Sequence, residues 1–91
     1  MARMPEQKYI PCTVFPGMLG NEYAVEFEVR GTLFSLFADK ADVKVMDSVP
    51  GQGLLRVRIQ DANADLIALP AETLEQGRRF LHYSIDQLLS A

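Results

Sequence analysis

Residues 22–38 read EYAVEFEVRGTLFSLFA, and this stretch decides the fold class. Its first half alternates two kinds of residue, with Tyr23, Val25, Phe27 and Val29 on one side and Ala24, Glu26, Glu28 and Arg30 on the other. A period of two is typical of a β-strand with one buried and one exposed face. Gly31 interrupts the pattern, and residues 32–37 are again rich in β-branched and aromatic side chains. We therefore predict two antiparallel strands that meet at Arg30-Gly31.

A two-residue turn at Arg30-Gly31 sets the register of this hairpin. It places Phe27 opposite Phe34 and Val25 opposite Leu36 on one face, and Glu28 opposite Leu33, Glu26 opposite Ser35 and Ala24 opposite Phe37 on the other. Arg-Gly suits a type I′ turn less well than Asn-Gly, because both central residues need a positive φ, so a longer loop is an alternative. Leu33 and Phe37 share their face with two glutamates. Either a neighbouring strand or loop covers them, or they belong to a partner interface.

Further short strands are predicted on both sides of this hairpin. They span residues 9–15, a short stretch from Val43, residues 54–60, residues 65–69 and residues 78–84. Pro11 has no N–H to donate, which predicts an edge position for the first strand or a start outside the ladder. Residues 78–89 also form a passable helical stripe, but the break at Gly77 and the aromatic content favour a strand.

The second predicted hairpin joins residues 54–60 to residues 65–69. A turn in residues 61–64 pairs Ile59 with Leu66, and it leaves Ile67 and Leu69 on the outer face beside Arg56 and Arg58. With both hairpins aligned, the predicted core is Val25, Phe27, Val29, Phe34, Leu36, Val57, Ile59 and Leu66.

These elements predict an all-β protein, a small antiparallel barrel of about five or six strands. Residues 70–77 contain an early proline and end on Gly77, which predicts one helical or 3-10 turn before the last strand. This order resembles the layout of the SH3-like class of small barrels. The resemblance implies a fold and no function, because the chain has no Trp and lacks the aromatic motifs that grip proline-rich ligands. We expect a flexible arm at residues 1–8 and a single domain at residues 9–91.

The composition of the chain indicates which classes of binding partner and which cellular compartment to expect. The chain has 91 residues, a net charge of −3 and one cysteine, and its pI is about 5.0. An acidic chain is not attracted by default to nucleic acid or anionic membranes. No segment approaches the roughly 20 apolar residues of a membrane helix, and residues 1–10 lack the apolar core of a secretory signal. We expect a cytoplasmic protein with no membrane association.

The sequence offers little for catalysis or cofactor binding. His82 is the single histidine, and one histidine with one cysteine does not make a tetrahedral zinc site. Cys12 lies in an apolar strand, where a buried and unreactive thiol is the usual case. Glycines near residues 17–20 and 51–53 are not followed by the Lys-Ser/Thr of a phosphate-binding loop. We expect no catalytic residue, no metal and no cofactor.

The strongest functional signal is a surplus of apolar side chains outside the predicted core. Met18 and Leu19 lie between two glycines in the loop of residues 16–21. With Leu33 and Phe37 they form the predicted partner-binding site. The alternative is that Met18 and Leu19 fold back and plug the open end of the barrel.

A basic strand face supports a second function. The candidate nucleic-acid surface is Lys44, Arg56, Arg58, Arg78 and Arg79, with Phe80 or Tyr83 alongside. Glu26 and Glu28 have the same spacing as Arg56 and Arg58, so pairing across adjacent strands is expected to neutralise this face. We therefore expect a non-enzymatic interaction module that binds a protein partner or forms a homo-oligomer such as a homodimer, with nucleic-acid binding as the alternative.

Overall fold

The structure, a computed structural model, describes residues 7–90, so most of the predicted flexible arm at residues 1–8 lies outside it. The strands are β1 (Lys8–Pro16), β2 (Glu22–Val29), β3 (Thr32–Asp39), β4 (Val43–Val45), β5 (Gly51–Asp61), β6 (Leu66–Ala68), β7 (Phe80–His82) and β8 (Leu89–Ser90). The 3-10 turn η1 (Lys40–Asp42) lies between β3 and β4, and the 3-10 turn η2 (Ile85–Gln87) lies between β7 and β8. The all-β prediction is confirmed.

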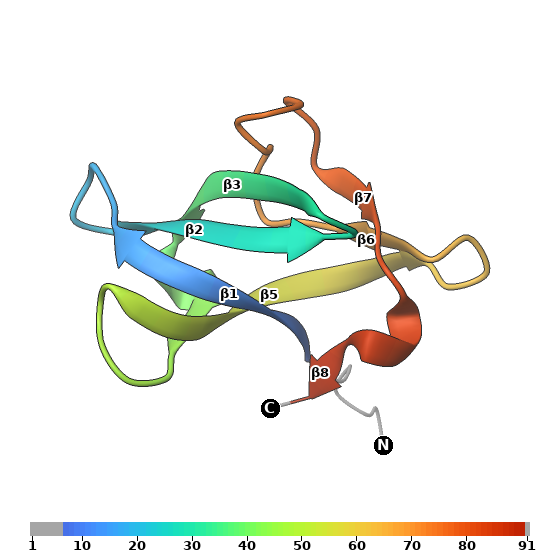
Figure 1. The fold of residues 1–91 in the computed structure, drawn as a ribbon, viewed down its shortest axis with the longest axis horizontal. Coiled ribbons are helices and arrows are strands. Elements are labelled where there is room, and N and C mark those ends of the chain that lie inside the picture. The colour runs from blue at the N-terminus through green and yellow to red at the C-terminus, as the bar shows by residue number, and fades with distance from the viewer. Residues whose placement is uncertain (1–6, 91) are drawn as a thin grey trace, which may run out of the picture.

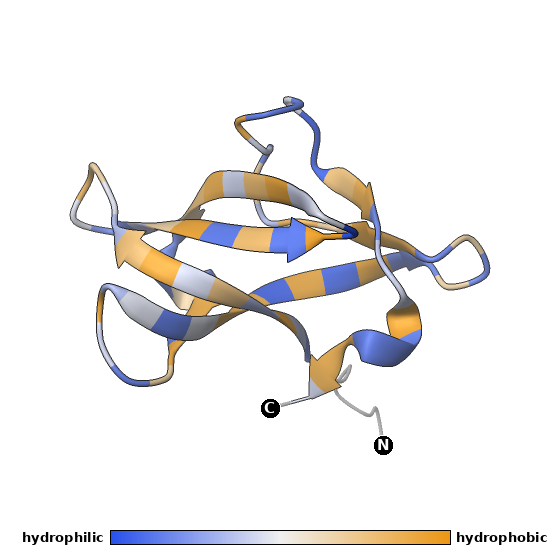
Figure 2. Cartoon of the chain, in the orientation of Figure 1, coloured by the Kyte–Doolittle hydropathy of each residue, from blue (hydrophilic) through white to orange (hydrophobic). Residues whose placement is uncertain are grey.

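The strands form one antiparallel sheet that curls into a half-barrel (Figure 1). Its order is β3-β2-β1-β5-β6-β7, with β4 paired to β5 and β8 paired to β1. Within the described residues, β3 and β7 are the two ends of this path and do not pair with each other. A closed SH3-like barrel is therefore not confirmed. Alternating apolar and polar bands along β2 and β5 show one face turned inward (Figure 2).

The β2–β3 hairpin has the predicted register from end to end. Phe27 pairs with Phe34, and Glu28 pairs with Leu33. The turn is two residues long because Arg30 takes φ 51° and Gly31 takes φ 82°, the double positive φ that a type I′ turn requires. The rings of Phe27 and Phe34 stack on the buried face with centroids 5.8 Å apart.

β1 lies inside the sheet, so its predicted edge position is wrong. It pairs with β5 along residues 8–14. On its other side it pairs with β2 through residues 13–16 and with β8 through residues 8–9. The gap between these two ladders falls at Pro11. An internal strand tolerates a proline there because no ladder bond on that side needs its N–H.

The predicted register of the β5–β6 hairpin is wrong by one residue. A bulge between Ile59 and Asp61 pairs Ile59 with Ile67, and a shift of one residue exchanges the two faces of a strand. Ile67 and Leu69 are therefore buried in the core, with 0% and 1% of their surface exposed. Leu66, which the register had placed inside, is half-buried.

The core otherwise matches the prediction at Val25, Phe27, Phe34, Leu36 and Val57, whereas Val29 and Ile59 are half-buried. Additional core side chains come from the middle of the sheet, and they include Ile10, Val14 and Leu55.

The end of the chain is a short strand followed by a 3-10 turn. Residues 78–84 contribute only the three-residue strand β7, which settles the choice between strand and helix in favour of strand. A single helical turn lies within residues 70–77, as predicted, and it is closed by the N–H of Gly77 donating to the carbonyl of Thr73 at 2.8 Å. A further 3-10 turn, η2, follows β7 and precedes β8.

Candidate functional site

The β1–β2 loop presents its two apolar side chains to solvent. Met18 is 83% exposed and Leu19 is 64% exposed. Two backbone hydrogen bonds shape the loop: the N–H of Glu22 donates to the carbonyl of Leu19 at 3.3 Å, and the N–H of Lys40 donates to that of Asn21 at 3.0 Å. The second bond fastens the loop beside the end of β3. The alternative in which Met18 and Leu19 plug the barrel is wrong.

The outer face of β3 is the second part of the predicted site. Leu33 is 53% exposed and Phe37 is half-buried. Between them, the loop of residues 69–79 is hydrogen-bonded to β3 at Ser35. The N–H of Leu74 donates to the carbonyl of Ser35 at 2.8 Å. A loop therefore covers the middle of this edge strand, and the position of Leu33 remains open.

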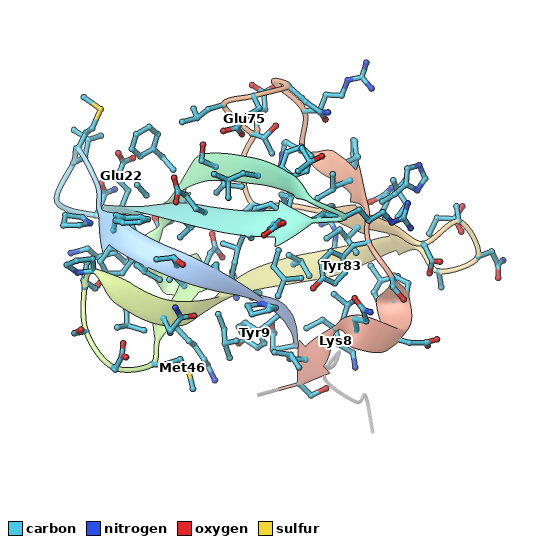
Figure 3. All side chains as sticks on the ribbon, in the orientation of Figure 1. Lys8, Tyr9, Glu22, Met46, Glu75 and Tyr83 are labelled. Atoms are coloured by element: carbon cyan, nitrogen blue, oxygen red, sulfur yellow. The ribbon has the colours of Figure 1, made fainter. Side chains whose placement is uncertain are left out.

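Glu75 fastens the same loop to Ser35. Its Oε1 accepts the backbone N–H of Ser35 at 2.7 Å, and its Oε2 accepts the hydroxyl of Ser35. Figure 3 shows Glu75 on the loop beside β3. The hydroxyl of Ser35, followed by its backbone N–H, lowers the pKa of the Glu75 carboxyl because both donors stabilise the charged form.

Leu74 adds an apolar side chain that the sequence reasoning missed. It is 62% exposed and lies next to Ser35. No local pattern identifies it, because the contact joins residues far apart in the chain. We call Met18, Leu19, Leu33, Phe37 and Leu74 the apolar surface.

A basic groove lies elsewhere on the half-barrel. It has a volume of ≈ 760 Å³, and its lining includes the cations Lys8, Arg56, Arg58 and Arg79 and one acid, Asp42. Its floor is apolar, with buried Val57 and Leu69. The sequence reasoning missed Lys8, whose Nζ donates to the hydroxyl of Ser90 at 3.1 Å.

The expected neutralisation by Glu26 and Glu28 is wrong. Arg56 pairs instead with Asp42, because β1 separates β2 from β5 in the sheet. Glutamates on β2 are thus two strands away from arginines on β5, beyond the range of a cross-strand pair.

The five predicted cations do not form one surface. Arg56, Arg58 and Arg79 meet in the basic groove. The Nζ of Lys44 lies 5.2 Å from the centroid of the Tyr9 ring, and Arg78 lines a different cleft between β3 and β7. Phe80 lies in that second cleft and not in the basic groove.

His82 and Cys12, the single histidine and the single cysteine, have different surroundings. The Nδ1 of His82 lies 3.0 Å from the carbonyl oxygen of Ala64, on the exposed surface. Cys12 is buried, and desolvation raises the pKa of its thiol to about 11. A buried neutral thiol is a poor nucleophile.

Fold and surfaces together define a small all-β half-barrel domain with an apolar surface and a basic groove. Between residues 7 and 90, no helix is both long and apolar enough to span a bilayer. The same residues contain no group of three or more His, Cys, Asp or Glu side chains suited to hold a metal ion. No protein-family model matches this chain, and no curated protein or solved structure matches it.

Proposed function

We propose that this domain is a non-enzymatic interaction module that binds a protein partner, or a second copy of itself, through the apolar surface. The observation that carries the proposal is the exposure of Met18 and Leu19 at the tip of a loop on a rigid sheet. Loops held by a rigid scaffold are where binding residues concentrate. Methionine also adapts to varied apolar partners because its side chain is flexible and polarisable.

The placement of β3 extends this surface. Leu33 and Phe37 lie along one face of the edge strand, and the β1–β2 loop is fastened beside its end. Burying two aliphatic side chains at an interface contributes roughly 3–5 kcal/mol before the costs of association. Two exposed loop residues are therefore enough to change an affinity measurably.

The test is the double variant Met18→Ser/Leu19→Ser, compared with Met46→Ser. Met46 is 64% exposed in a different loop, so it is a matched control for the loss of an exposed methionine. We expect the double variant to keep the parent melting temperature and to lose association. Sedimentation measures self-association, and comparative affinity enrichment measures partners retained by the parent and by Met46→Ser but not by the double variant.

A lower melting temperature of the double variant, at concentrations where the parent is monomeric, would assign Met18 and Leu19 to the core. Unchanged association in both assays would remove the loop from the binding site.

The basic groove supports nucleic acid as a second candidate ligand. It gathers Lys8, Arg56, Arg58 and Arg79 around an apolar floor. Its described lining has no aromatic side chain on which a base could stack, and stacking is a main source of affinity for single strands. With a net charge of −3, we expect no binding tighter than about 1 μM at physiological salt. Tighter binding to a single-stranded oligonucleotide that weakens steeply with salt would favour this candidate.

A further inference from the structure

A cleft separates the two end strands of the half-barrel. It has a volume of ≈ 680 Å³, with Val29, Thr32 and Phe34 of the β2–β3 hairpin on one side and Phe80, Leu81 and His82 of β7 on the other. Residues 72 and 76–79 line it as well, and their loop is fastened to β3 through Ser35 and Glu75. The cleft therefore occupies the place where a further strand would complete the barrel.

Among the described residues, unpaired strand backbone lies along the β7 wall of the cleft and, on β3, at Leu33, which lies between the lining residues Thr32 and Phe34. On β3, Ser35 directs its N–H and carbonyl away from β2, because the N–H donates to Glu75 and the carbonyl accepts the N–H of Leu74, both in the loop of residues 69–79. Antiparallel pairing alternates residue by residue, so Leu33 directs its own N–H and carbonyl the same way. On β7, the carbonyl of Arg79 and the N–H of Tyr83 bond toward β6. The intervening Phe80 and His82 therefore direct their backbone groups away from β6, and no partner for them lies within residues 7–90.

The charge of the lining is opposite to the charge of the whole chain. Arg30, Arg78 and Arg79 line the cleft, together with His82, against the single carboxylate of Glu72. The whole chain carries a net charge of −3, so this positive lining is a local arrangement. Arg79 also lines the basic groove, and its Nε donates to the carbonyl of Leu69 in that groove at 3.3 Å.

An apolar floor accompanies these charges. Phe34 is buried beneath the cleft, and Phe80 is 52% exposed in its wall. A ligand that fits must supply backbone N–H and C=O groups for two strand edges, some apolar contact, and negative charge. A peptide chain has all three features, whereas a nucleic-acid strand has no alternating row of N–H and C=O groups.

We infer that this cleft binds an extended acidic peptide segment of a partner protein, which enters between β3 and β7 as an added strand. β7 contributes three residues, so the segment pairs over a short length. This site shares Leu33 with the apolar surface of the proposed function but does not use Met18 or Leu19, so either one stands if the other fails.

The test uses a synthetic peptide of about eight residues in which glutamate alternates with valine, a pattern that matches the two faces of a strand. It is titrated into the isotope-labelled full chain and followed by nuclear magnetic resonance. We expect saturable shifts of the amide resonances of Leu33, Phe80 and His82, with slower hydrogen exchange at these amides. Shifts confined to the Met18-Leu19 loop or the basic groove, or no saturable shift, would overturn the inference.

Two control ligands separate strand pairing and charge from other causes. A peptide of the same length with lysine in place of glutamate is expected to bind at least about tenfold more weakly, since like charges meet in the cleft. N-methylation of alternate backbone amides of the acidic peptide is expected to abolish binding, because it removes the ladder donors. Equal binding of all three peptides, or displacement of the acidic peptide from these amides by an oligothymidine, would contradict a peptide-binding cleft.

A matched pair of charge reversals locates the site. Arg78→Glu changes a cation that lines the cleft, and Lys40→Glu makes the same change in charge at a cation whose Nζ lies 4.9 Å from the centroid of the Tyr23 ring. We expect Arg78→Glu to weaken the acidic peptide about tenfold and Lys40→Glu to leave its affinity within about twofold of the parent value, because screening is strong between distant exposed charges. Equal losses in both variants would show a non-specific charge effect and would reject the site. The Met18→Ser/Leu19→Ser variant is expected to bind the peptide as the parent does.

Discussion

The carboxylate of Glu75 accepts both the backbone N–H and the hydroxyl of Ser35, a residue 40 positions earlier in the chain. This pair holds the loop of residues 69–79 against the open edge of β3. An uncovered edge strand is a template for pairing with another chain. Glu75 therefore blocks the centre of this edge and leaves Leu33 and Phe37 on either side of the blocked position.

Replacing Glu75 by glutamine should make stability less dependent on pH in the acid range. The folded pKa of Glu75 is lowered, so its contribution is present above the ordinary glutamate pKa and is lost as the pH falls through the folded value. At neutral pH we expect Glu75→Gln to cost at most about 1 kcal/mol of unfolding free energy, because solvent screens an exposed group. Urea denaturation at several pH values measures the difference.

The control for this experiment is Glu72→Gln, which removes a carboxylate from the same loop. Its unfolding free energy should follow the parent curve within about 0.5 kcal/mol. A constant difference between parent and Glu75→Gln down to the most acid pH would show that the charge of Glu75 does not stabilise the fold.

Truncation of either stacked ring should destabilise the core strongly. Phe27 and Phe34 are 4% and 5% exposed, and Phe→Ala in a packed core costs about 3–5 kcal/mol. We expect Phe27→Ala and Phe34→Ala each to lower the unfolding free energy by that amount, measured by chemical denaturation. Met46→Ala, at an exposed position, should change it by less than about 0.5 kcal/mol. A folded Phe34→Ala protein with the parent melting temperature would contradict the hairpin register.

Gly53 should not tolerate a side chain. A Cβ there would lie 2.5 Å from Cγ2 of Val14 and 2.7 Å from the carbonyl oxygen of Lys44. We expect Gly53→Ala to cost about 1–3 kcal/mol, because β5 would have to move away from β1 or β4. Gly20→Ala is the matched control, since nothing lies within 4 Å of its added Cβ. Similar thermal shifts in the two variants would contradict the close approach at Gly53.

Cys12 should react slowly in the folded protein. Burial raises the pKa of its thiol from 9.0 to about 11, which lowers the thiolate fraction about 100-fold near neutral pH. We expect alkylation by iodoacetamide, followed by mass spectrometry, to be at least that much slower in the native protein than in urea. The raised pKa also means that this thiol contributes stability below pH 9.0 that is lost as the pH rises through about 11. Equal alkylation rates in native protein and in urea would show that Cys12 is accessible.

Local patterns in the sequence predict the class of fold and the register of one hairpin. The alternation in residues 22–38 predicts β2, β3 and every pair between them, because period-two patterning and a short turn act between neighbours in the chain. The two glycines around Met18 and Leu19 predict a loop, but they left open whether these side chains are exposed or plug the barrel, and the structure shows them exposed.

Contacts between segments that are distant in the chain could not be predicted from such local patterns. The bulge between Ile59 and Asp61 exchanges the buried and exposed faces of β6, and no residue type in that stretch predicts a bulge. The pairing of Arg56 with Asp42 depends on β1 lying between β2 and β5. The Ser35–Glu75 contact and the cleft between β3 and β7 depend on where the curled sheet ends. The spacing of residues along the chain indicates which segments are strands and which face of each strand is buried. The order of the strands in the sheet sets these distant contacts, and that order depends on how all the apolar faces pack together into one core.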